Sequence, residues 1–170
     1  MNKSYAGIGA RTTPIEIQSR MTKIARMLSQ QGFVLHSGGA FGADTAFAMG
    51  ANKAKIFLPD IKKLYEMSSE YLVTYPNHDL IIDIHPKAFE IAKDHHPKWD
   101  ALNYYVKCLH ARNAQILLDE DLEHPVKFVI CWTPDAKIVG GTGLGLRIAK
   151  TFGIDVYNLA DLKRETQWAL

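Results

Sequence analysis

The sequence is poor in the features that mark secreted and membrane proteins. It has only two cysteines, Cys108 and Cys131, and neither belongs to a CxxC pair. This usage is typical of a reduced, cytoplasmic compartment and predicts two buried thiols. No stretch approaches the roughly 18 apolar residues of a membrane span, and the N-terminus lacks the apolar region of a signal peptide. We therefore expect a soluble protein without a membrane partner.

Charge of one sign is also scarce. The chain has 20 lysines and arginines against 18 aspartates and glutamates, and no run of like charge. A non-specific polyanion binder is therefore disfavoured, and any contact with nucleic acid has to be local. With 170 residues, 47% of them hydrophobic, the chain is long enough for one well-buried core and too short for two. We expect a single domain over residues 1–170.

Strand-like and helix-like patterns alternate along the chain. Thr13, Pro14 and Glu16 predict a capping box at the start of the first helix. Predicted strands cover 4–9, 33–39, 55–60, 126–132 and 154–159, and predicted helices cover 11–32, 43–54, 86–93, 97–118 and 144–152. Residues 61–83 have a mixed pattern, in which 71–76 fits a strand or an ordered loop. The alternation predicts an α/β fold, a doubly wound Rossmann-like domain with a mainly parallel sheet flanked by helices.

The segment KIVGGTGLGLRIAK, residues 137–150, is rich in glycine just before a predicted helix. It misses two familiar signatures, because Leu146 stands where a dinucleotide fingerprint needs glycine or alanine and where a P-loop needs lysine. Gly7-x-Gly9-x-x-Thr12 misses the fingerprint as well, which weakens an NAD-dependent dehydrogenase hypothesis. Glycines before a helix favour an anion, because the backbone can come close and the first-turn N–H groups are unpaired. They also serve tight turns that bind nothing.

Three glycine-containing segments each follow a predicted strand: GIGART, SGGAFGAD and VGGTGLG. Loops at the carboxyl ends of parallel strands share one edge of a sheet, and ligands bind where the strand order reverses. If the first and fourth predicted strands are neighbours, the first and third of these loops face each other across a crevice. We expect a ligand site there.

Four segments, in this order, resemble the SLOG superfamily, the Rossmann-type domain shared by the DNA-processing protein DprA (Smf) and the LOG, or lysine-decarboxylase-like, proteins. GIGART resembles the DprA segment VGSR, and SGGAFGADTAF resembles SGxARGID-x-x-AH. HARNAQI resembles F-x-x-RNR-x-I through Arg112, Asn113 and Ile116. GGTG resembles the LOG pattern PGGxGT-x-x-E, and GTGLGLRIAKTFGIDVYNL follows the spacing of the DprA segment GSGSLITA-x-x-A. The resemblance runs from about residue 5 to 160, without 60–95, and implies a nucleotide or single-stranded DNA as partner, and self-association.

The departures from these patterns concern the chemistry. Val139, Leu144 and Arg147 stand where the LOG pattern has proline, threonine and the glutamate associated with hydrolysis of the N-glycosidic bond. An arginine stays protonated and cannot act as a general acid or base, so hydrolysis would need other residues. On the DprA side, Phe41 replaces a basic residue, and the second arginine of RNR is replaced by Ala114 or Gln115.

Candidate ligand-binding residues come from these segments. Arg11 and Arg112 suit bidentate phosphate contacts, or else surface salt bridges, and Ser37 and Thr142 can donate hydroxyls to phosphate or cap turns. Asp44 is the candidate catalytic residue, with helix capping or a ribose contact as alternatives. Trp132 suits base stacking or core packing, and Thr133 or Asp135 suits a sugar contact. The ligand-binding set is Gly9, Arg11, Ser37, Gly38, Gly39, Arg112, Asn113, Thr133, Gly140, Gly141, Thr142 and Gly143.

The segment 78–96 contains several histidines and aspartates, but no pair has a recognised metal spacing such as HExxH. We expect no metal site there, and we expect 61–98 to form an insertion or a lid that covers the ligand. The leading hypothesis is a protein that binds a nucleotide or a nucleotide-derived phosphorylated ligand, as a sensor or as a nucleoside 5′-monophosphate N-glycosidase, with no further cofactor. The alternative is a stand-alone DprA-like module that binds single-stranded DNA or a DNA-processing partner.

Overall fold

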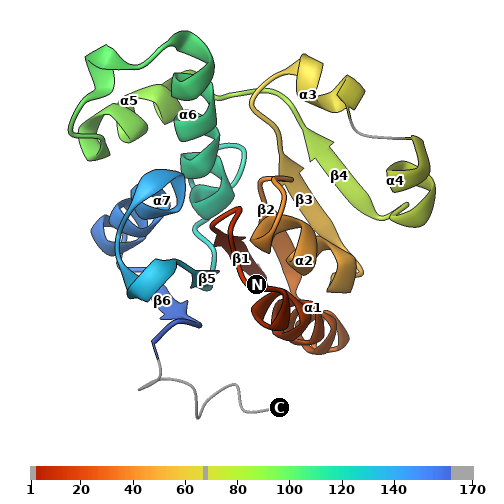
Figure 1. The fold of residues 1–170 in the computed structure, drawn as a ribbon. Helices are drawn as coiled ribbons and strands as arrows, with labels where there is room; N and C mark the ends of the chain where they lie inside the picture. Colours follow the sequence, from red (N-terminus) through yellow and green to blue (C-terminus); the bar gives the residue numbers. More distant parts are fainter. Residues whose placement is uncertain (1–2, 67–68, 162–170) are drawn as a thin grey trace.

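The computed structural model describes residues 3–66 and 69–161, and it contains a six-stranded sheet in which all neighbouring strands are parallel. The strands lie in the order β4-β3-β2-β1-β5-β6 (Figure 1). They are β1 (Ser4–Gly9), β2 (Val34–Ser37), β3 (Ala54–Phe57), β4 (His78–Ile81), β5 (Phe128–Trp132) and β6 (Asp155–Asn158). The helices are α1 (Ile15–Gln30), α2 (Ala43–Gly50), α3 (Ile61–Glu66), α4 (Ser69–Thr74), α5 (Pro86–His95), α6 (Tyr104–Leu118) and α7 (Gly140–Thr151). The predicted α/β class is confirmed.

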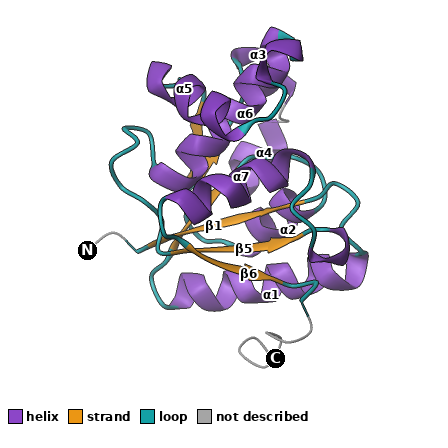
Figure 2. Cartoon of the chain, turned by 90° about the vertical axis from the view of Figure 1, so that its left-hand side faces the viewer, coloured by secondary structure: helices purple, strands orange, loops and turns teal. Residues whose placement is uncertain are grey.

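Helices cover both faces of the sheet, with α1 on one side of the strands and α6 and α7 on the other (Figure 2). Successive residues of the central strands therefore pack into different cores. Tyr5 joins the core beneath α1 and α2, whereas the next residue, Ala6, joins the core beneath α5, α6 and α7. In β5, Ile130 joins the core beneath α1 and α2, and Val129 joins the core beneath α5, α6 and α7. This double burial explains why the β5 sequence is a nearly continuous apolar run.

The strand order reverses at β1, which pairs with β2 on one side and β5 on the other. Gly9 lies opposite Trp132, and the Ala10 N–H donates to the Trp132 carbonyl at 3.1 Å. The expected adjacency of the first strand and the VKFVICW strand is confirmed. The loops after β1 and β5 consequently face each other, the arrangement in which open α/β sheets bind ligands.

The four glycines of the segment 137–150 belong to helix α7 and not to a loop before it. α7 begins at Gly140, four residues before the predicted start at 144, and only Gly140 among its glycines has a left-handed φ, +63°. A Cβ on Gly143 would lie 2.8 Å from the Ile138 carbonyl carbon, and one on Gly145 would lie 3.2 Å from the Ile8 side chain. The last two glycines therefore allow close packing of α7.

Two other predicted helix starts are wrong. The Thr13 hydroxyl donates to the Ala10 carbonyl at 2.6 Å and caps no helix, so the capping box does not form. α6 begins at Tyr104 rather than near Pro97, with the Asn103 side chain accepting from the Val106 N–H at 2.9 Å. Asn103 satisfies a first-turn donor, which fixes this boundary.

The region that the sequence left unassigned contains α3, α4 and the edge strand β4. Residues 71–76 are neither a strand nor an ordered loop, because α4 covers most of them. The strand lies further along, at His78–Ile81, where the ring of His78 contacts Tyr71 and the Ala51 carbonyl. The strand begins with two polar residues, His78 and Asp79, so its sequence lacks the alternation of apolar and polar residues that predicts a strand.

Both predicted thiols are buried and form no disulfide within the described residues: Cys108 lies on α6 and Cys131 on β5. Within the described ranges, no helix has the length and apolar character to cross a membrane.

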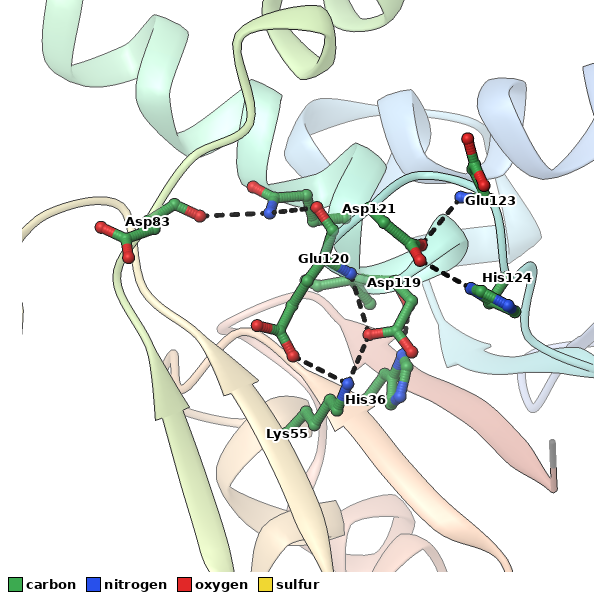
Figure 3. A network of polar contacts seen from close by, with 10 residues as sticks. His36, Lys55, Asp83, Asp119, Glu120, Asp121, Glu123 and His124 are labelled. Atoms are coloured by element: carbon green, nitrogen blue, oxygen red, sulfur yellow. Dashed lines mark hydrogen bonds and ion pairs between the residues drawn. The ribbon is translucent and has the colours of Figure 1, made fainter.

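A polar network joins the end of α6 to β3 (Figure 3). The Lys55 ammonium donates to Asp119 at 2.7 Å and to Glu120 at 2.8 Å. Partial burial acts to lower the pKa of Lys55, but these two hydrogen bonds outweigh it and raise that pKa. The lysine is thereby held charged beside Asp119, whose side chain is only 14% exposed.

We expect Lys55→Met to lower the free energy of unfolding by about 1–2 kcal/mol, because it leaves the poorly exposed Asp119 carboxylate without its cation. Urea unfolding at neutral pH measures this change. Lys63→Met is the matched control, since the ion pair of Lys63 within the described residues is with the half-exposed Glu66, and its loss should cost no more than about 0.5 kcal/mol. Equal effects of the two substitutions would contradict a structural role for the network.

Candidate functional site

A cleft of about 460 Å³ opens at the carboxyl ends of β1 and β5. Its walls are the loop after β1, the inner face of α6, and the first turn of α7. This size is in the range of small-molecule and cofactor sites. The lining residues are Ile8, Gly9, Ala10, Arg11, Ala40, Asp44, Val106, Leu109, His110, Arg112, Asn113, Ile116, Thr133, Pro134, Val139, Gly140, Gly141 and Thr142.

Arg112 is the main cation of this cleft. Its side chain projects from α6 and is only 8% exposed, yet its Nε has no hydrogen-bond partner among the described residues. The guanidinium lies against Gly38, where an added Cβ would overlap it. Burial lowers the pKa of Arg112, the charge of Asp44 opposes this, and the charge of Arg11 adds to it. A buried guanidinium without a hydrogen-bonded anion is costly, so this position favours an anion.

Arg11 adds a second positive charge at the cleft. It is exposed and forms no ion pair with any residue of the described ranges. The carbonyls of Ala10 and Arg11 lie against Gly42, where a Cβ would come within 2.8 Å of both. The loops after β1 and β2 are therefore packed together at Gly42. The φ of Gly42, +83°, is a second reason for glycine at this position.

Asp44 is the one carboxylate among the residues that line the cleft. It opens α2 and accepts the Ala40 N–H at 3.2 Å, which places it under the loop after β2. Burial raises the pKa of Asp44, and the charge of Arg112 partly offsets this. Asp44 thus orders the loop and balances part of the Arg112 charge.

The N-terminus of α7 forms another wall of the cleft. No side chain caps it and its first turn holds no acidic residue. The first helical hydrogen bond runs from the Gly143 N–H to the Val139 carbonyl at 2.9 Å, so the N–H groups of Gly140, Gly141 and Thr142 precede the helical pattern. These donors, together with the helix dipole, favour an anion at this end.

His110 also lines the cleft, one helical turn before Asn113 on α6. Burial first, and then the nearby charges of His96, Arg112 and Arg147, lower the pKa of His110 to about 4. Its Nδ1 is buried without a partner in the described part of the chain. At neutral pH His110 is therefore an uncharged imidazole.

The depressed pKa of His110 predicts a loss of stability on acidification. As the pH falls from about 6.5 to about 4, the unfolded state binds a proton at this position and the native state does not. Urea unfolding at pH 7 and pH 5 should therefore show a smaller loss for His110→Gln than for the wild type. His36 and His78 have lowered pKa values as well and supply the remaining loss, so equal losses in the two proteins would contradict a neutral His110.

The structure gathers most of the predicted ligand residues into this cleft. Those that line it are Gly9, Arg11, Arg112, Asn113, Thr133, Gly140, Gly141 and Thr142, together with Asp44. The Asn113 amide donates to the Gly141 carbonyl at 3.2 Å and so ties α6 to α7. The Thr133 hydroxyl accepts from the Asn158 amide at 2.7 Å, which links the cleft to the end of β6.

Four predicted residues do not line the cleft: Ser37, Gly38, Gly39 and Gly143. The Ser37 hydroxyl is buried and donates to the Gly7 carbonyl at 2.7 Å, so it is used within the sheet. Gly38 acts indirectly, as the surface against which Arg112 lies. Trp132 packs against the core beneath α1 and α2 and does not line the cleft, which leaves core packing as its role.

Neither of the two departures from the LOG pattern in α7 lines the cleft. Leu144 is fully buried in the core, and the Arg147 Nε donates to the His95 carbonyl at 2.8 Å. Position 147 is therefore not a cleft position in this fold. No group of three or more His, Cys, Asp or Glu side chains in the described ranges is arranged to hold a metal ion.

Sequence reasoning missed His110, Val106 and Leu109, which line the cleft from α6. With Asn113 they form one helical face at spacings of three and four residues. Their spacing from Asn113, which already belonged to a candidate motif, could have identified these three residues.

No protein-family model matches this sequence, and no curated protein sequence matches it. The fold, however, is similar to a solved structure of DNA processing protein A from Helicobacter pylori, which was described for its mode of single-stranded DNA binding. The TM-score is 0.62 and the sequence identity is 20%, over 92% of this chain and 65% of that chain.

The chain has a DprA-like fold. This likeness concerns the fold alone, and the chain spans about 65% of the length of the DprA chain.

Proposed function

We propose that this protein binds single-stranded DNA, with a backbone phosphate held in the cleft. The observation that carries the proposal is the buried Arg112 guanidinium at the cleft, whose Nε has no hydrogen-bond partner in the described chain. The N-terminus of α7, which no described side chain caps, and Arg11 line the same cleft. A phosphate oxygen is the acceptor that suits both an arginine fork and a helix N-terminus.

The DprA-like fold supports DNA over other phosphate ligands, because the solved neighbour binds single-stranded DNA. The near balance of 20 basic and 18 acidic residues is compatible with this, provided that few phosphates are contacted. Membership of the SLOG superfamily, proposed from the four motifs, agrees with a ligand at the crossover of β1 and β5.

A nucleoside 5′-monophosphate is the second candidate, favoured by the cleft volume of about 460 Å³. For this candidate, the cleft supports binding of the nucleotide better than hydrolysis of its N-glycosidic bond. Asp44 is the sole lining carboxylate, and its Oδ2 already accepts the Ala40 N–H.

The test is fluorescence anisotropy with a labelled oligothymidylate of about 20 nucleotides, measured between roughly 50 and 200 mM salt. Each neutralised phosphate contributes a slope of about 0.7 in log affinity against log salt on a single strand. Contact with one to three phosphates therefore predicts a slope of roughly 1 to 2. Unlabelled nucleoside monophosphates serve as competitors, with mass spectrometry for released base.

Saturable oligonucleotide binding with this shallow slope is the expected result. Binding of mononucleotides without binding of the oligonucleotide would replace the proposal with the second candidate, and released base would make that candidate an enzyme. A protein that binds neither would refute both.

A further inference from the structure

The loop between β2 and α2 presents an uncovered aromatic ring beside the cleft. Phe41 is 79% exposed, although the preceding residue, Ala40, lines the cleft. Exposure of a whole phenyl ring to water forgoes the favourable burial that such side chains normally obtain. The ring is therefore exposed on a short segment between two residues that line the cleft, Ala40 and Asp44.

The backbone around Phe41 is fixed from several directions. The Ala40 N–H donates to Asp44, and the Ala40 carbonyl accepts both the N–H and the hydroxyl of Thr45 at 3.1 and 2.8 Å. Gly39 and Gly42 have φ values of +66° and +83°, and Gly42 packs against the Arg11 carbonyl. A ring held on an ordered loop loses little conformational freedom when it binds a flat partner.

Further apolar side chains stand around the cleft. Tyr105, 46% exposed on the first turn of α6, lies close enough to act on the pKa of Arg112. Val139, 49% exposed, lines the cleft at the start of α7. Positive charge inside a cleft and aromatic rings beside it form the combination with which proteins hold single-stranded nucleic acid.

We infer that Phe41 is a nucleobase-stacking residue, which takes the base attached to the nucleotide whose phosphate lies in the cleft. The inference rests on the proposed function and adds a subsite to it. Stacking accepts every base, because each has an aromatic face, so this subsite gives affinity without sequence preference. Phe41 also replaces the basic residue of the DprA segment, so a stacking contact stands where that pattern has a charge.

The test compares a ten-nucleotide oligothymidylate with an abasic strand of the same length and charge, by anisotropy at one salt concentration. Wild type should bind the oligothymidylate about tenfold more tightly. Phe41→Ala should lose this preference while its affinity for the abasic strand stays unchanged, and Phe41→Trp should keep it. Tyr65→Ala is the matched control, because Tyr65 is also 79% exposed but lies on α3 and does not line the cleft.

The outcomes separate this inference from the function on which it rests. Equal binding of the two strands by wild type, or a preference that survives in Phe41→Ala, overturns the stacking subsite and leaves phosphate binding intact. Failure of wild type to bind either strand overturns the proposed function itself. A shift of Phe41→Ala from a dimer to a monomer in light scattering would assign the ring to an interface between copies, and the inference would be wrong.

Discussion

Arg112→Met is expected to abolish binding of single-stranded DNA, with a loss of at least about 30-fold. The guanidinium is the buried cation of the cleft, and loss of one partner of a desolvated charged hydrogen bond costs about 2–5 kcal/mol. Methionine has a similar length and leaves little space behind. Anisotropy with the labelled oligothymidylate measures the change.

The same substitution should leave the unliganded protein folded. Arg112 has no hydrogen-bonded anion within the described chain, so its replacement by an apolar side chain removes a desolvation cost, which offsets the loss of its favourable interaction with the charge of Asp44. The pKa of Asp44 should rise further, because the charge of Arg112 now helps to keep that carboxyl ionised. Circular dichroism and urea unfolding at pH 7 report on the fold.

Arg26→Met removes the same charge from an exposed position of α1 and is the matched control. Arg112→Lys keeps the charge but loses the planar fork, and should recover only part of the affinity. Wild-type affinity in Arg112→Met would show that the cleft is not the DNA site.

Gly141→Asp should have opposite effects on binding and on stability. Gly141 lies in the uncapped first turn of α7, and a Cβ built there meets only the Asn113 amide, at 3.9 Å. A carboxylate at this position interacts favourably with the helix dipole, so the free energy of unfolding should rise by about 0.3–1 kcal/mol. It also repels a phosphate in the cleft, so DNA affinity should fall at least about 30-fold.

Gly141→Asn is the control, because its side chain has nearly the same shape without the charge. It should bind more tightly than Gly141→Asp, and the difference between the two variants should shrink as salt is raised. A loss of affinity equal in both variants would indicate that space, rather than charge, limits the ligand.

Part of the cleft lining could be predicted from residue type and motif, although the predicted roles of these residues stay predictions. Arg112, Asn113 and Gly141 were singled out by motif, and the cleft contains all three. Ser37 was singled out equally well, yet its hydroxyl donates to the Gly7 carbonyl, because the alternation of β2 turns it into the sheet interior. The sequence alone shows which functional groups the chain contains, but the direction in which a side chain points depends on the strand register.

Helix boundaries failed for a related reason. Helix α7 starts four residues earlier than expected, because its glycines serve close contacts with Ile138, just before the helix, and with Ile8 of β1. Glycine lowers helix propensity locally, but close packing against another element outweighs that cost.

What the sequence determined by itself is the α/β class, the strand at each side of the crossover, and the glycine-rich carboxyl edge, because apolar periodicity and glycine placement are local properties. Tertiary structure alone decided that the Arg112 Nε is buried without a hydrogen-bond partner among the described residues, that Arg147 does not line the cleft, and that Phe41 is exposed. Burial and pairing depend on which distant segments pack together, and that is set by the strand order β2-β1-β5 and the helices above it. The burial of this charge at the cleft, on which the proposed phosphate site depends, therefore comes from the fold as much as from the residue.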